Sequence, residues 1–143
     1  MQYRETPFGF VVVLEPGDEL IHSLIRFARR QDLEAGSLIG IGAVRAIELG
    51  FYDTVRCEYD RRRFEEPLEA CSIIGNIGLV DGEPFPHVHG TFGRADFSTL
   101  GGHVFEAVCA VTVELSVHVA PVPWERREVE FCSLRLLQLE TQR

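Results

Sequence analysis

The chain has 143 residues, 45% of them hydrophobic, and a formal net charge of -8 at pH 7. This length and composition predict one globular domain over residues 1–143, with a core that needs no disulfide or metal to hold it together. The negative charge opposes unassisted binding to the phosphate backbone, so direct contact with nucleic acid is not expected.

The longest apolar run near the start covers residues 8–14 (FGFVVVL). It is too short to span a bilayer, and an acidic residue follows it. The basic start and the cleavage site of a signal peptide are both missing. We therefore expect a cytoplasmic protein without a membrane segment.

One helix is predicted within residues 15–36. Apolar residues recur at helical spacing from Leu20 to Ala28, with acidic residues before them and two arginines after them. Acid first and base last complements the helix dipole, and Gly36 is the predicted terminator.

Most of the remaining chain is predicted to be strand, because β-branched and aromatic residues partly alternate with polar ones between Gly, Asp and Pro. The economical architecture is α+β, a mainly antiparallel sheet with one principal helix packed against it. About five residues at each chain end are expected to be loose. The predicted strands cover residues 8–14, 37–43, 45–53, 56–64, 68–80, 87–94, 103–119 and 131–139.

The predicted strand 103–119 carries little polarity on either face over much of its length. In a chain of this size, a sheet covered on both faces needs more than one helix to cover it. A partner subunit would supply the rest, so we expect a homo-oligomer.

Neither the cysteines nor the arginine clusters are predicted to form a functional site. The four cysteines, Cys57, Cys71, Cys109 and Cys132, are far apart and form no CxxC pair, which favours buried free thiols over disulfides or a thiolate metal site. The arginine clusters at residues 61–63 and 126–127 have acidic neighbours, so they are predicted to be solvated, locally neutralised surfaces.

Residues 84–103 (PFPHVHGTFGRADFSTLGGH) hold three of the five histidines. In a strand, residues i and i+2 face the same side, so His87 and His89 would project together, roughly 6.5 to 7 Å apart. Val88 and Phe92 have the opposite parity and would take the packed side. Two imidazoles at this spacing can share one metal ion.

The third histidine, His103, would lie beside this pair if the two strands pair with each other. It shares its parity with Phe105 and Ala107, however, which belong to the more apolar face, so a regular strand would aim it away. A bend or bulge at residues 101–102 (GG) would rotate it back.

The metal interpretation therefore competes with two exposed histidines and one unrelated one. Three neutral imidazoles suit zinc, nickel, copper or iron(II). We expect a divalent ion, zinc first, with an open coordination position of the kind that catalytic zinc sites have. His22 is predicted to be a partly exposed helical residue, and His118 has no assigned role.

Three segments, residues 39–53, 68–93 and 100–119, resemble in order and spacing the plants-and-prokaryotes-conserved (PPC) domain family. The PHVH followed by GGH is the most specific element. The resemblance implies an α+β fold that assembles as a homotrimer, and a metal held by histidines that match His87, His89 and His103. Plant relatives add AT-hook segments of the RGRP type, which this sequence lacks, so a DNA-binding label would rest on kinship of fold alone.

Three functions remain open. The first is a trimeric metal-binding module whose centre admits a small molecule. The second is a metal-dependent, hydrolase-type enzyme with Glu106, Asp96 or Glu114 as general base. The third is a regulatory scaffold linked to transcription that acts through protein partners. A cupin also carries an HxH pair, but the early helix and the lack of a following glutamate count against it.

Overall fold

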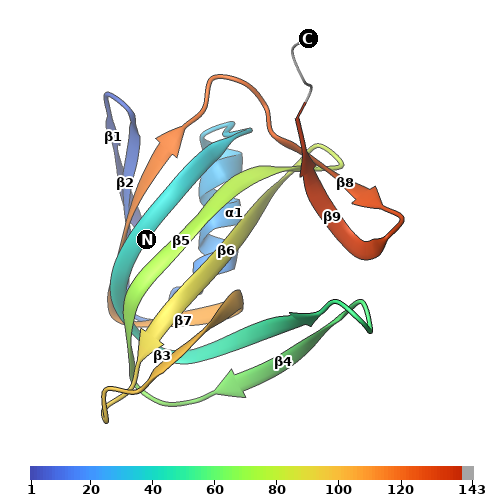
Figure 1. Ribbon diagram of the computed structural model, residues 1–143. Helices are drawn as coiled ribbons and strands as arrows, with labels where there is room; N and C mark the ends of the chain where they lie inside the picture. The colour runs from blue at the N-terminus through green and yellow to red at the C-terminus, as the bar shows by residue number, and fades with distance from the viewer. Residues whose placement is uncertain (140–143) are drawn as a thin grey trace.

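The computed structural model describes residues 1–139, which form one helix packed against a nine-stranded, mostly antiparallel sheet (Figure 1). The expected α+β class is confirmed. The elements are β1 Gln2–Thr6, β2 Gly9–Leu14, α1 Leu20–Arg30, β3 Gly36–Asp53, β4 Glu58–Phe64, β5 Leu68–Val80, β6 Glu83–Gly93, β7 Thr99–Val119, β8 Glu125–Val129 and β9 Cys132–Gln138.

Helix α1 lies where it was predicted, but it ends earlier. Asp32 adopts a left-handed conformation with φ of 46°, and the Leu33 amide donates to the carbonyl of Ala28 at 2.9 Å. This Schellman-type end satisfies the last carbonyls of the helix, and Asp is one of the few residues besides Gly that tolerates it. The prediction of Gly36 as terminator is wrong, because Gly36 already begins β3.

The N-terminal residues were expected to be loose, but they are ordered. Strand β1 pairs with β2 in an antiparallel ladder, and the amino group of Met1 pairs with Glu15 at 2.6 Å and Asp18 at 2.7 Å. At the other end, Leu139 follows β9 without regular structure. The other four C-terminal residues of that prediction lie outside the described residues.

Some strands are longer than predicted, and two, β1 and β8, were missed. The two segments 37–43 and 45–53 form the single strand β3, and neither β1 nor β8 had a predicted counterpart. Cysteine burial was also overestimated. All four cysteines are free, as predicted, but only Cys109 is buried; Cys57 and Cys132 are half-buried and Cys71 is exposed. Within residues 1–139, no helix has both the length and the apolarity to cross a membrane.

The helix covers one face of the sheet and leaves the other open. Leu24 and Phe27 of α1 are fully buried in the core. On the opposite face, the register aligns Ile39 with Ile74 and places Val11 close by. These apolar side chains, with Ile41, are 43 to 59% exposed. We call Val11, Ile39, Ile41 and Ile74 the open apolar face.

Four strands close into a ring. Strands β3 and β6 each pair with both β5 and β7. The first residues of β7 therefore lie between β3 and β6, and the hairpin formed by β3 and β4 extends away from the rest of the sheet (Figure 1). This closure brings the GGH segment against the PHVH segment.

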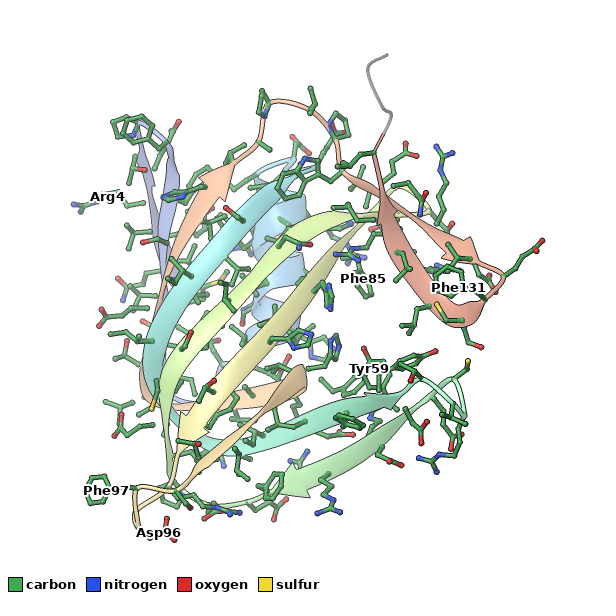
Figure 2. All side chains as sticks on the ribbon, viewed as in Figure 1. Arg4, Tyr59, Phe85, Asp96, Phe97 and Phe131 are labelled. Carbon is green, nitrogen blue, oxygen red and sulfur yellow. The ribbon has the colours of Figure 1, made fainter. Side chains whose placement is uncertain are left out.

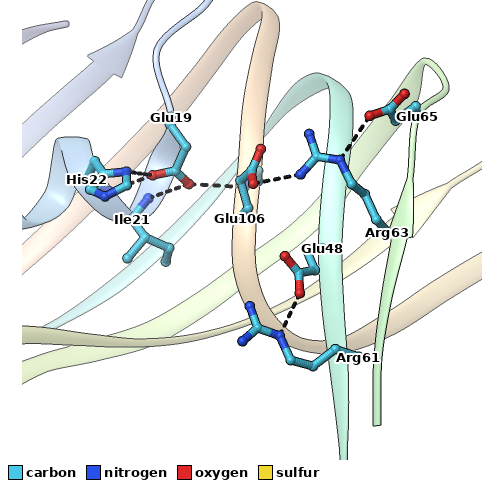
Figure 3. A network of polar contacts seen from close by, with 9 residues as sticks. Glu19, Ile21, His22, Glu48, Arg61, Arg63, Glu65 and Glu106 are labelled. Atoms are coloured by element: carbon cyan, nitrogen blue, oxygen red, sulfur yellow. Dashed lines mark hydrogen bonds and ion pairs between the residues drawn. The ribbon is translucent and has the colours of Figure 1, made fainter. Parts of the chain in front are cut away.

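Glu19 joins the helix to the sheet (Figure 3). Its carboxylate caps α1 by accepting from the amides of Ile21 at 3.0 Å and His22 at 2.7 Å. It also accepts from the amide of Ala107 in β7 at 3.1 Å. One side chain thus satisfies donors from two elements that are far apart in the sequence.

Replacing this carboxylate should destabilise the fold. In Glu19→Ala, the helix loses its cap and the Ala107 amide loses its acceptor, so the free energy of unfolding should fall by about 2 kcal/mol. Urea unfolding followed by circular dichroism measures the change. Glu65→Ala, which removes only the exposed partner of Arg63, should change stability by less than about 0.5 kcal/mol. Equal effects in the two variants would contradict the role given to Glu19.

Candidate metal centre

The structure brings His87, His89 and His103 together. The centroids of their rings are 5.2 Å apart for His87 and His89, 5.1 Å for His87 and His103, and 5.3 Å for His89 and His103. One ring nitrogen from each lies within 4.8 Å of the other two. The spacing is that of three side chains turned toward a common point.

Strand β6 positions the first two histidines by simple alternation. Val88 and Phe92 are fully buried on the core side, as predicted. His87 and His89 therefore face outward, where His87 lies beside Asn76 of β5 and His89 lies beside His103 of β7.

His103 reaches the other two because β7 contains a bulge, although not at the expected place. The pairing at Gly101 and Gly102 is regular. Instead, β3 advances one residue from Glu48 to Leu49 while β7 passes from Glu106 to Val104, which leaves Phe105 as the extra residue.

The bulge changes which parity faces the core. Val104 and Ala107 are both buried although they are three positions apart, an odd number that regular alternation would place on opposite faces. A bulge reverses the in-and-out order of side chains along a strand. His103 therefore shares the outer face with Phe105, whose ring centroid is 4.6 Å from that of His103.

Aromatic rings and a close backbone contact hold His103 in place. The ring of Tyr59, from β4, is 5.1 Å from His103 and 5.0 Å from Phe105. A Cβ atom on Gly50 would come within 2.5 Å of the Phe105 ring and 2.8 Å of the Tyr59 ring. Only glycine at position 50 leaves room for this packing.

Arg126 of β8 borders the site on the side of His87, and the sequence interpretation of this residue was wrong. It is 6% exposed, not a solvated surface residue. Its Nη2 donates to Oδ1 of Asn76 at 2.7 Å and to Nδ1 of His87 at 3.2 Å. Its guanidinium lies 5.6 Å from the ring of Phe85, which Figure 2 shows beside the C-terminal hairpin.

A single register position fixes Arg126 there. Strand β8 runs parallel to β5 and pairs with it through Leu79 and Glu125, and the Leu79 amide donates to the Trp124 carbonyl at 2.7 Å. Alternation then turns Arg126 inward and Arg127 outward, where Arg127 pairs with Glu125 as predicted. The in-and-out alternation of this short strand was the signal that charge patterning overlooked.

Two of the histidines are held neutral by their surroundings. Burial, then the charge of Arg126 and that of His89, lowers the pKa of His87 to about 4. Burial, then His87 and His89, lowers the pKa of His103 to about 4. A neutral imidazole offers a lone pair, so protons do not compete with a metal at neutral pH.

The donor set fits a divalent metal ion. Nδ1 of His103 is buried and has no hydrogen-bond partner within residues 1–139. A buried nitrogen without a partner is uncommon, and an ion bound there would satisfy it. Three imidazole nitrogens are the ligand type and number found in catalytic zinc sites.

The three candidate general bases do not join the histidines. Glu106 pairs with Arg63 at 2.7 Å, and that hydrogen bond lowers the pKa of Glu106. Asp96 lies in the turn between β6 and β7, at the bottom left of Figure 2, well away from Tyr59 beside the histidines. Glu114 is exposed on the open side of the sheet, next to Ile41.

His87 and His89 open onto a groove of about 530 Å³ on the open side of the sheet. Ile39 and Ile74 line it, so it is continuous with the open apolar face. None of the described residues that line it is acidic. His118 lines its other part, and His22 lies on α1 with its side chain 88% exposed, as expected.

Known proteins share the fold of this chain, and a family model matches most of its length. The family model of the Plants and Prokaryotes Conserved (PCC) domain matches residues 1–121. No curated protein matches the chain.

Several solved structures superpose over nearly the whole chain. A provisionally named DNA-binding protein from Bacteroides thetaiotaomicron has 26% identity and a TM-score of 0.92 over 96% of both chains. One with a similar provisional name from Ralstonia eutropha has 29% identity and a TM-score of 0.90 over 96% of both chains. A metal-containing protein from Archaeoglobus fulgidus has 30% identity and a TM-score of 0.85, over 97% of this chain and 100% of the other.

The low pKa values predict how stability depends on pH. In the unfolded chain, His87 and His103 regain the ordinary pKa of 6.5, whereas in the folded protein it is about 4. Between these values the unfolded state binds more protons, so the free energy of unfolding of the metal-free protein should fall as the pH falls through this window. Urea unfolding at several pH values measures it.

The double variant His87→Asn, His103→Asn removes both titrating groups and serves as the comparison. Its stability should fall less steeply over the same window than that of the unchanged protein. Parallel curves would show that other groups cause the loss.

Proposed function

The chain belongs to the Plants and Prokaryotes Conserved (PCC) domain family, and we propose that it is a homotrimeric protein that binds one divalent metal ion per chain. His87, His89 and His103 are the proposed ligands, and zinc is the first candidate ion. The centre is open to a small molecule from the groove.

One observation carries the metal proposal: three outward-facing imidazoles converge, with one nitrogen of each within 4.8 Å of the others. Structural histidines usually have hydrogen-bond partners when buried, whereas Nδ1 of His103 has none within residues 1–139. The relative from Archaeoglobus fulgidus, 30% identical, is named a metal-containing protein, which supports the proposal.

A bound ion with three protein ligands would supply Lewis acidity at its open position. The protein would supply neutral ligands, the aromatic wall of Tyr59 and Phe105, and the Arg126 side chain at the edge. A hydrolase with a carboxylate base is not favoured, because no acidic residue lines the described groove.

Direct DNA binding is not part of the proposal, although two relatives carry that provisional name. The net charge is -8. The arginine cluster on β4 is neutralised locally, since Arg61 pairs with Glu48 and Arg63 pairs with Glu65 and Glu106. A role in regulation would therefore depend on protein partners.

Assembly is proposed from the open apolar face. Four branched apolar side chains, 43 to 59% exposed, lie together on the side of the sheet that α1 does not cover. Such a patch on a small protein is typical of a subunit interface. The sequence resemblance implies that the assembly is a trimer. The cytoplasm remains the expected location.

Metal content tests the ligand assignment. The purified protein should contain about one equivalent of metal per chain, and His87→Ala, His89→Ala and His103→Ala should each lower it about tenfold or more, because each removes a third of the ligands. Elemental analysis after dialysis against zinc measures it. His22→Ala, which removes an exposed histidine of α1, should leave the metal content unchanged. Full metal content in all three ligand variants would refute the site.

Light scattering tests the assembly. Ile39→Asp combined with Ile74→Asp places two charges on the open apolar face, so the mass should change from that of a trimer to that of a single chain. Phe97→Asp makes the same kind of change at an exposed residue in the turn between β6 and β7 and should leave the trimer intact. A trimer that survives the double change would place the interface elsewhere.

A further inference from the structure

Arg126 is a buried cation without an acidic partner. It is 6% exposed, and no carboxylate within residues 1–139 pairs with it. By contrast, Arg56, Arg63 and Arg127 each pair with Asp or Glu. Taking a guanidinium out of water without a counter-charge is strongly unfavourable, and burial accordingly lowers the pKa of Arg126. The fold keeps an uncompensated charge beside the histidines.

The guanidinium also has hydrogen-bonding capacity that the protein does not use. Nη2 donates to Asn76 and His87, and Nη1 makes a long contact of 3.4 Å with the carbonyl of Arg135. Nε is buried and has no partner within residues 1–139. Because a guanidinium has five N–H donors and no acceptor, this one has donors left for a ligand.

Metal binding would release a further donor. Arginine only donates, so His87 must accept at Nδ1 and carry its own proton on Nε2. A neutral imidazole has one lone pair, and a ring that gives this lone pair to a metal no longer accepts from Arg126. Whichever nitrogen of His87 would bind the ion, an Nη2 N–H of Arg126 would lose its acceptor on His87 and become available to a ligand.

The charges around the centre favour one small anion. The three imidazoles are neutral ligands, the ion would be divalent, and no described groove residue is acidic. Arg61, the other arginine close to His103, is paired with Glu48 and lies over the Phe105 ring. Arg126 is thus an uncompensated protein cation beside the proposed divalent ion, so the charges at the site suit an anionic ligand.

The side chains that line the groove indicate the chemistry of the rest of the ligand. Beside His87 and His89 it is lined by Ile39, Ile74 and Trp124. These side chains favour an apolar group attached to the charged head. A planar guanidinium matches a planar carboxylate with two parallel N–H donors.

We infer that Arg126 is the anion-recognition residue of this protein and binds the carboxylate of a small, partly apolar ligand that enters the metal centre. The inference rests on the proposed metal centre, and it concerns a residue outside the region 1–121 that the family model matches. The guanidinium would pair with the carboxylate, and the three histidines would hold the ion beside it. Arg126 opposes metal binding by charge repulsion until the carboxylate arrives, so the metal and the carboxylate bind cooperatively.

The test uses the 143-residue chain loaded with cobalt(II), whose visible spectrum reports changes in coordination. Isobutyrate is the probe, with isobutyramide as its neutral equivalent and inorganic phosphate as the competing anion. Isobutyrate should change the spectrum with saturation, and isobutyramide should not. Phosphate that binds more tightly than isobutyrate, or isobutyramide that binds equally well, would overturn the carboxylate assignment.

Two variants examine Arg126 itself. Arg126→Gln removes the charge and should weaken isobutyrate binding about tenfold or more, because a charge-assisted hydrogen bond is lost. In buffer without carboxylates, the same variant should bind zinc as tightly as the unchanged protein or more tightly. Arg126→Lys keeps the charge and should recover part of the isobutyrate affinity. Arg127→Gln, the exposed neighbour, is the matched control and should change neither affinity.

In Arg126→Gln, isobutyrate affinity should fall while zinc affinity stays or rises, and this difference separates anion recognition from a structural role. A merely structural Arg126 would weaken zinc and isobutyrate together when replaced by Gln, and that result would overturn the inference. If Arg126→Gln does not fold, the decision falls to Arg126→Lys and to the preference of the unchanged protein for isobutyrate over isobutyramide. A protein that binds no metal at all refutes the proposed function, whereas one that binds metal but ignores isobutyrate refutes only this inference.

Discussion

The bulge at Phe105 lets β7 serve two sets of neighbours. On one side of it, Ala107, Cys109, Val113, Leu115 and Val117 are buried in the core. On the other side, Val104 takes the inward direction and His103 turns outward to lie between Gly50 of β3 and His89 of β6. A regular strand could bury the same apolar residues only by turning His103 away. The core and the histidine cluster depend on the same extra residue.

Most arginines of the described residues are paired with acidic side chains, but the one beside the histidines is not. Arginine is its only strongly basic side chain, since no lysine occurs, and most of the described arginines near the surface have acidic partners. Around the histidines the reverse holds, because two imidazoles are kept neutral and Arg126 has no carboxylate. A site that excludes acids while collecting neutral ligands and one buried cation is suited to binding a metal together with an anion.

The position of the groove links ligand binding to assembly. Ile39 and Ile74 line the groove and also belong to the open apolar face. A subunit that packs on this face would lie next to the metal centre and would narrow its access from solvent. Small ligands would then be selected by size as well as by charge. The proposed site and the proposed interface therefore share one surface.

The sequence alone determined the elements that depend on local pattern. The helix follows from its apolar spacing, the outward direction of His87 and His89 follows from alternation with Val88 and Phe92, and the resemblance of three segments indicated the family. These features depend on residues close together in the chain, where the periods of helix and strand are fixed by backbone geometry.

Only the tertiary structure decided the features that depend on distant pairing. The place of the bulge was set by how β7 pairs with β3, and sequence reasoning placed it too early, at Gly101 and Gly102 instead of Phe105. Arg126 looked like a surface residue because its sequence neighbours are acidic, yet one parallel contact between β8 and β5 turns it inward against His87. A strand pattern fixes which residues share a face, but the partner strand decides what that face meets.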